Sequence, residues 1–234
     1  MATYVLVHGA WSGAHGFRKL RPLLRNAGHE VFTPSLTGIG ERAHLASPQV
    51  NLSTHVHDVV NMILYEDLVD IVLLGFSYGG FVVTGALAHI GERVRHLVYL
   101  DAFVPNDGDT LVGRAEGDLP IPITLGQPWL MPPVPREFDD AVEAAFSNAR
   151  RVPHPVGCFI EPVHLRRPLE DFGFTRTYIK ATADTRDAPG GRAFWGAADR
   201  AKASPAWCYH EIATNHMVPN NRPEELAQIL LALG

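Results

Sequence analysis

The sequence has 234 residues, of which 46% are hydrophobic, and its formal net charge is −5. This length suits one domain with a large core, and the acidic balance makes nucleic acid an unexpected partner. The two cysteines, Cys158 and Cys208, lie in no pattern typical of a metal site or a disulfide scaffold. The sequence also has no leader-like segment and no run of about 20 apolar residues, so we expect a cytoplasmic protein without membrane association.

Short runs of β-branched and aliphatic residues, bounded by turn residues, recur along the chain and predict strands. They cover Tyr4–Val7, Glu30–Thr33, Ile71–Leu74, His96–Leu100, Thr177–Lys180 and Trp207–Ile212. Segments with helical spacing alternate with them, at Phe17–Ala27, Thr54–Leu68, Tyr78–His89, Gly191–Ala203 and Pro223–Leu233. This alternation predicts the α/β class, with a mostly parallel central sheet flanked by helices.

The alternation fails between about residues 105 and 172, where many of the 18 prolines gather. Proline has no amide donor for a sheet ladder, so this segment cannot form central strands. One amphipathic helix is expected within it, at Phe138–Ala149. We therefore predict one domain over residues 1–234, with a cap inserted between two of its sheet strands.

The segment Gly75-Phe76-Ser77-Tyr78-Gly79 fits the pattern G-x-S-x-G and lies between an apolar strand and a helix. In that context the pattern predicts a tight turn that presents Ser77 above the sheet as a nucleophile, with small flanking residues because strand and helix approach closely. The alternative is a chance match in a glycine-containing loop, and the strand-to-helix context favours the turn.

A serine hydroxyl is a weak nucleophile until a base takes its proton, and the chain has 12 histidines. His216 lies in the loop that follows the last predicted strand and precedes Pro223, which is where this architecture places the base. His55 and His57 are two apart on a predicted helix and do not face one another, so we expect both to be solvated. His8, beside Gly9, is expected to be structural.

The acid that orients the imidazole should follow a strand that precedes the histidine. Asp184, after the strand Thr177–Lys180, is the favoured candidate. Asp187 and Asp101 are alternatives, the second because it follows the strand after the nucleophile helix. Any of the three could instead be a solvated loop carboxylate.

Two backbone amides are expected to stabilise the developing oxyanion, one from the residue after the nucleophile and one from the first loop. These are Tyr78 and Ala10. Large apolar side chains near the turn and in the cap could line a substrate pocket, or could equally be core. They are Trp11, Phe81, Phe103, Trp129, Leu130 and Met131.

These motifs resemble a group of α/β-hydrolases that includes plant methyl-salicylate esterases, polyneuridine-aldehyde esterase and hydroxynitrile lyases. The likeness covers nearly the whole chain, at Val5–Trp11, Leu23-Leu24, Ala27–His29, Gly75–Gly79, Asp101–Pro105, Thr182–Asp184 and Asn215–Met217. It implies the α/β-hydrolase fold, a triad of Ser77, Asp184 and His216, the oxyanion donors Ala10 and Tyr78, and a homodimer. The sequence departs from the group at Phe76, where a histidine is common, and in the cap.

We therefore expect a serine hydrolase that cleaves a small or medium carboxylic ester through an acyl-enzyme, without a metal or organic cofactor. The alternatives are a hydroxynitrile lyase or a lactonase with the same triad, and a non-catalytic small-molecule receptor of the same fold. Gly9 and Met217 stand where rubber-tree-type lyases of the group have threonine and lysine, which favours an esterase. A receptor would not need a whole triad.

Overall fold

The computed structural model describes residues 1–115 and 129–234 of the chain. Its main sheet has six strands in the order β2-β1-β3-β4-β7-β8, and each neighbouring pair is parallel. The strands are β1 (Thr3–Val7), β2 (Glu30–Phe32), β3 (Ile71–Phe76), β4 (Val94–Leu100), β7 (Thr175–Ala181) and β8 (Cys208–Ile212). Each predicted strand is present with shifted ends, and the predicted α/β class is confirmed.

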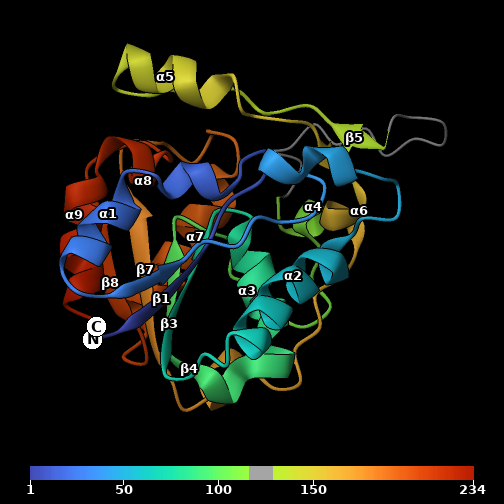
Figure 1. The fold of residues 1–234 in the computed structure, drawn as a ribbon. Helices are drawn as coiled ribbons and strands as arrows, with labels where there is room; N and C mark the ends of the chain where they lie inside the picture. Colours follow the sequence, from blue (N-terminus) through green and yellow to red (C-terminus); the bar gives the residue numbers. More distant parts are fainter. Residues whose placement is uncertain (116–128) are drawn as a thin grey trace.

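Helices cover both faces of this sheet (Figure 1). On one face lie α2 (Leu52–Tyr65), α3 (Gly79–Ile90) and α7 (Gly191–Ala203), and on the other lie α1 (Leu20–Asn26) and α9 (Pro223–Leu231). The shorter helices outside the insertion are η1 (Ala14–Phe17), η2 (Gly40–Leu45), η3 (Gly91–Arg93) and α8 (Val218–Asn221). Within the described ranges, no helix has the length and hydropathy needed to cross a membrane.

Strand residues alternate between the two cores, as the two-residue period of a strand requires. In β1, Val5 and Val7 pack in the core beneath α2 and α3, whereas Tyr4 and Leu6 pack in the core beneath α1 and α9. All six residues of β3 are buried, because helices cover both of its faces. The central strand that leads to Ser77 is therefore fixed from both sides.

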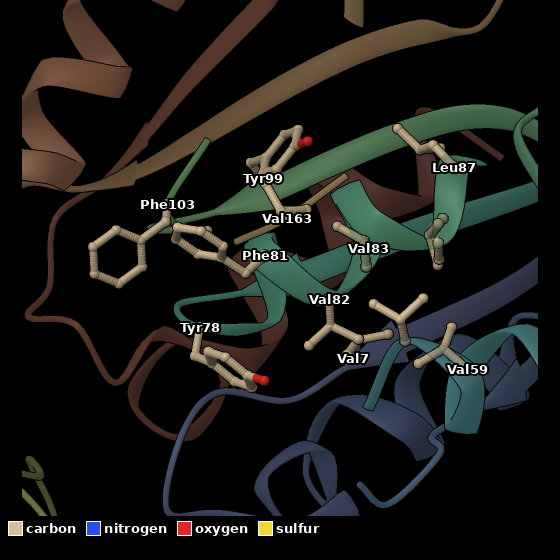
Figure 2. Close-up of a cluster of buried hydrophobic side chains, with 14 of the residues drawn as sticks. Val7, Val59, Tyr78, Phe81, Val82, Val83, Leu87, Tyr99, Phe103 and Val163 are labelled. Carbon is tan, nitrogen blue, oxygen red and sulfur yellow. The ribbon is translucent and has the colours of Figure 1, made fainter. Parts of the chain in front are cut away.

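Helix α3 packs unusually close to its neighbours because small residues lie along it. A Cβ atom at Gly85 would lie 2.7 Å from Cγ2 of Val56 in α2, and one at Gly80 would collide with the carbonyl oxygen of Phe103. The large residues of α3 fill the space that remains, and Figure 2 shows Phe81, Val82 and Val83 among buried side chains of other elements. Ser77 thus precedes a helix whose position is tightly determined.

Helix α2 corrects the sequence interpretation of His55. The helix begins with a capping box formed by Asn51 and Thr54, and its buried residues include His55, Val56 and Val59. His57 is exposed, as predicted, but His55 is fully buried and contacts Tyr78. The prediction of a solvated His55 was wrong because the buried stripe of α2 is wide enough to include it.

The chain between β4 and β7 forms an insertion whose described residues add no strand to the main sheet. Its elements are α4 (Leu111–Arg114), β5 (Leu130–Met131), α5 (Ala141–Asn148), β6 (His154–Pro155), α6 (Gly157–Ile160) and η4 (Leu169–Asp171). Helix α5 lies beyond one end of the sheet, and the two chain termini lie at the opposite end (Figure 1). Part of the predicted cap, residues 116–128, lies outside the described residues.

Gly80→Ala is expected to lower the free energy of unfolding by about 2 kcal/mol, because the added methyl group would collide with the chain at Phe103. Urea unfolding followed by circular dichroism measures this change. Gly173→Ala is the matched control, because nothing lies within 4 Å of a Cβ atom there. Equal losses of stability in the two variants would contradict the close packing of α3.

Candidate active site

Ser77 lies at the strand-to-helix turn that the sequence predicts, between β3 and α3. Its φ angle is 56°, a left-handed conformation that a non-glycine residue rarely adopts. The Ser77 amide donates to the Leu100 carbonyl at 3.2 Å, and its carbonyl accepts from the Phe103 amide at 3.3 Å. Backbone bonds to the end of β4 and the loop after it therefore hold the turn and expose the hydroxyl.

His216 follows β8 and its ring lies between Ser77 and Asp101. Its Nε2 atom is 2.9 Å from the Ser77 hydroxyl, and its Nδ1 atom is 2.7 Å from Oδ2 of Asp101. An ionised carboxylate only accepts hydrogen bonds, so Nδ1 holds the proton and Nε2 accepts from the hydroxyl. This arrangement prepares Nε2 to take the Ser77 proton.

Two aromatic rings enclose the His216 imidazole. Phe76, which precedes the nucleophile, stacks at a centroid distance of 4.8 Å, and Phe194 of α7 stacks at 4.9 Å with an interplanar angle of 5°. Stacking against these two rings restricts rotation of the imidazole. Phe76 therefore has a clear structural role at the position where the related group commonly has histidine.

Asp101 has three buried hydrogen-bond partners. Its Oδ1 atom accepts from Nζ of Lys180 at 2.6 Å and from the Ala181 amide at 3.3 Å, which leaves Oδ2 for His216. Both Asp101 and Lys180 are at most 1% exposed. Buried charges require partners of this kind, because each is removed from water.

The structure therefore differs from the sequence prediction for the acid. Asp184 accepts a hydrogen bond from the backbone amide of His216 at 2.8 Å, and it is Asp101 that contacts the imidazole. Asp187 is exposed and lies 3.6 Å from Arg192. Strands β4 and β7 are neighbours, so the residues after both of them approach the same histidine loop, and chain order alone does not distinguish them.

The surroundings of the pair favour a neutral histidine and an ionised aspartate. Burial and, after it, the nearby Arg136 cation lower the pKa of His216 to about 4, against the opposing effect of Asp101. Burial acts to raise the pKa of Asp101, but His216 and Lys180 outweigh it, so this pKa lies below its ordinary value. The imidazole is thus in its basic form at neutral pH.

Ala10 and Tyr78 line the same cavity as Ser77, as expected for oxyanion donors. In the described part of the chain, neither backbone amide donates a hydrogen bond. The loop that contains Ala10 is held from the insertion, because the Trp11 amide donates to Nδ1 of His154 at 3.2 Å and the Trp11 indole donates to the Met131 carbonyl at 3.0 Å. Two free amides near the nucleophile suit a developing oxyanion.

The cavity beside Ser77 has about 10 Å³ of space, room for about one water molecule. Of the six predicted pocket residues, Trp11 and Phe103 line it. Phe81 is core and fully buried, and Trp129, Leu130 and Met131 lie in or beside β5; these four do not line this cavity. The sequence interpretation missed other lining residues: Leu111, Arg136, Phe159, Pro189, Gly190 and Phe194.

A much larger hollow, of about 600 Å³, lies elsewhere. Residues around Pro105, Pro168 and Arg200 line it, and neither Ser77 nor His216 does. The volume of this hollow is therefore no reason to regard it as the space beside the nucleophile. The hydrogen-bonded groups at Ser77 mark the candidate active site more directly than volume.

Three buried residues near Tyr78, namely His55, His154 and Cys158, are of types that can bind a metal ion. Each of His55, His154 and Cys158 has one nitrogen or sulfur atom within 4.8 Å of the others. The His55 ring nitrogens already bond the Tyr78 hydroxyl at 2.9 Å and the Thr37 carbonyl at 2.8 Å. His154 accepts from Trp11 through Nδ1, so its other nitrogen is a proton donor and not a ligand. Burial also raises the pKa of the Cys158 thiol, which disfavours the thiolate that binds metals. These residues do not fit a metal ion.

Comparisons with known proteins place the chain in one group. Residues 4–229 match the alpha/beta hydrolase family. A carbendazim-hydrolysing esterase of Nocardioides sp. (strain SG-4G) is 38% identical over 100% of both chains. An alpha-hydroxynitrile lyase of Arabidopsis thaliana is 33% identical over 44% of this chain and 40% of its own. An extracellular alpha/beta-hydrolase structure from a Paenibacillus species has a TM-score of 0.81 at 23% identity, and covers 100% of this chain and 99% of its own.

Proposed function

The chain belongs to the alpha/beta hydrolase family, and on that premise we propose that it is a serine esterase with Ser77 as nucleophile. One observation carries the proposal: a continuous line of hydrogen bonds joins Asp101, His216 and Ser77. The full-length relative named as a carbendazim-hydrolysing esterase supports ester hydrolysis. The substrate is a small or medium carboxylic ester.

The mechanism follows from the positions of these groups. Ser77 Oγ attacks the ester carbonyl carbon while Nε2 of His216 takes the hydroxyl proton. Asp101 stabilises the imidazolium that forms, and the amides of Ala10 and Tyr78 stabilise the oxyanion. His216 then gives its proton to the leaving alcohol as the bond between carbonyl carbon and alcohol oxygen breaks. Water repeats the sequence on the acyl-enzyme and releases the acid.

Asp184 and Lys180 act as positioning residues in this scheme. Asp184 bonds the His216 amide and so fixes the loop, whereas Lys180 bonds the second oxygen of Asp101 and holds that carboxylate in place. We assign the inserted segment the role of a cap. The cavity beside Ser77 is too small for an ester, so a substrate would enter as the cap moves.

The proposal includes a reducing, cytoplasmic location. Cys158 is buried and Cys208 is exposed, and both are free thiols. Free cysteines are typical of proteins that remain in a reducing compartment. The homodimer implied by the resemblance stays a prediction, which light scattering of the purified protein would test.

Wild-type protein is expected to hydrolyse p-nitrophenyl esters of short and medium acids. The Ser77→Ala substitution is expected to lower kcat by about 10⁴-fold or more, because no other group would form the acyl-enzyme. Release of p-nitrophenol measures turnover, and circular dichroism verifies that the variant folds. A folded wild type that cleaves no ester would contradict the proposal and favour the lyase or receptor alternatives. Cyanohydrin cleavage and ligand binding would then be measured.

Asp101→Asn is expected to lower kcat by about 10⁴-fold, because an amide in place of the carboxylate would neither hold the imidazole tautomer nor stabilise the imidazolium. Asp184→Asn should lower kcat by less than about tenfold, because it changes a bond to the backbone of His216. The exposed Asp187→Asn is the control. Loss of activity in Asp184→Asn alone would restore Asp184 as the acid.

The acid limb of the profile of kcat/KM against pH is expected near pH 4, well below the ordinary histidine range. Only neutral His216 can take the Ser77 proton, so activity is retained above this pKa and lost as pH falls through it. Hydrolysis rates from pH 3.5 to 8, with folding verified at each pH, measure the limb. An acid limb near 6.5 in fully folded protein would contradict the depressed pKa.

A further inference from the structure

Arg136 lies in the cap and faces the catalytic groups. It lines the cavity of Ser77, Ala10 and Tyr78, and it also lines the adjoining groove that His216 and Asp184 border. Arg136 therefore borders both spaces, the cavity beside Ser77 and the groove beside His216. The mechanism above does not use it.

The Arg136 guanidinium makes few hydrogen bonds for a half-buried cation. It donates to the Pro189 carbonyl at 3.3 Å, and within residues 1–115 and 129–234 it has no ion pair with a carboxylate. Arg176 offers a contrast, because it is more deeply buried and bonds the carbonyls of both Leu169 and Phe172. A guanidinium has five donor hydrogens, so most of those on Arg136 remain available.

A second cap arginine lies near the first. Arg151 donates to the carbonyl of Val134 at 2.6 Å, two residues before Arg136, and its guanidinium carbon lies 6.0 Å from the Trp11 ring centroid. Burial, the larger effect, and the charge of Arg136 together lower the pKa of Arg151 to about 10. It too has no carboxylate partner among the described residues. Two like charges that act on one another and are only partly exposed to water favour an anion between or beside them.

We propose that Arg136, supported by the charge of Arg151, binds a carboxylate on the ester substrate, so that the enzyme prefers esters with a free carboxylate. This inference rests on the proposed esterase function. The guanidinium matches a carboxylate because both are planar and can form paired hydrogen bonds. The two arginines thereby gain the carboxylate ion pair that they lack among the described residues.

Matched ester pairs test the proposal. On the acyl side, p-nitrophenyl hemiglutarate is compared with p-nitrophenyl pentanoate, and on the alcohol side 4-acetoxybenzoate is compared with 4-acetoxybenzamide. In Arg136→Gln, the ratio of kcat/KM for the anionic ester to that for the neutral ester should fall at least tenfold in one of the pairs. Arg136→Lys should lose less, because it keeps the charge.

Arg150→Gln is the matched control, because it removes one positive charge from an exposed residue next to Arg151 that contacts Phe146. Its ratios should stay at the wild-type values. Unchanged ratios for both pairs in Arg136→Gln, or an equal fall in Arg150→Gln, would overturn the proposal. The pair that responds tells whether the carboxylate belongs to the acid or to the alcohol.

A binding measurement separates this proposal from the esterase function. Ser77→Ala is titrated calorimetrically with glutarate and with 4-hydroxybenzoate, and the same titrations are made on the double variant Ser77→Ala/Arg136→Gln. At least one anion should bind the single variant at least tenfold more tightly than the double variant. Equal binding to both, or no binding to either, would overturn the anion site, even if wild-type protein cleaves neutral esters.

Discussion

The candidate site depends on one buried charge, the carboxylate of Asp101. A carboxylate removed from water costs several kcal/mol unless charged or polar groups replace the lost solvent. Lys180 of β7 bonds one of its oxygens and His216, after β8, bonds the other. Asp101 itself follows β4, so its carboxylate links the ends of the neighbouring strands β4, β7 and β8. These contacts fix the position of the imidazole relative to Ser77.

Buried polar contacts join the inserted segment, the proposed cap, to the loop that contains Ala10. His154 and the Met131 carbonyl, both in the cap, accept the two hydrogen bonds that Trp11 donates. At the other side of the cap, the buried Glu143 pairs with Arg18 and Lys19 near the start of the chain. Cap movement that admits a substrate would therefore also release the loop of Ala10, and cap closure would restore the oxyanion donors together with the exclusion of water.

Local patterns predicted the sheet, the turn at Ser77 and the histidine that contacts Ser77, because each depends on residues close together in sequence. The acid was not predictable in this way, since Asp101 and Asp184 follow adjacent strands and only three-dimensional packing shows which carboxylate reaches Nδ1. The pocket was largely missed for a related reason. Its walls come from the insertion and from α7, where neither periodicity nor a motif indicates which side chains face Ser77, and Arg136 lies in an irregular proline-containing segment.

The proposed anion site and the catalytic base are linked by charge. Arg136 lowers the pKa of His216, because a nearby cation disfavours the imidazolium. A carboxylate bound to Arg136 would offset that cation, so the pKa of His216 would be higher in the substrate complex than in the free enzyme. A higher pKa makes Nε2 a stronger base towards the Ser77 proton. An anionic substrate would thereby strengthen the base that activates Ser77, whereas a neutral ester of the same size would leave His216 at its depressed pKa.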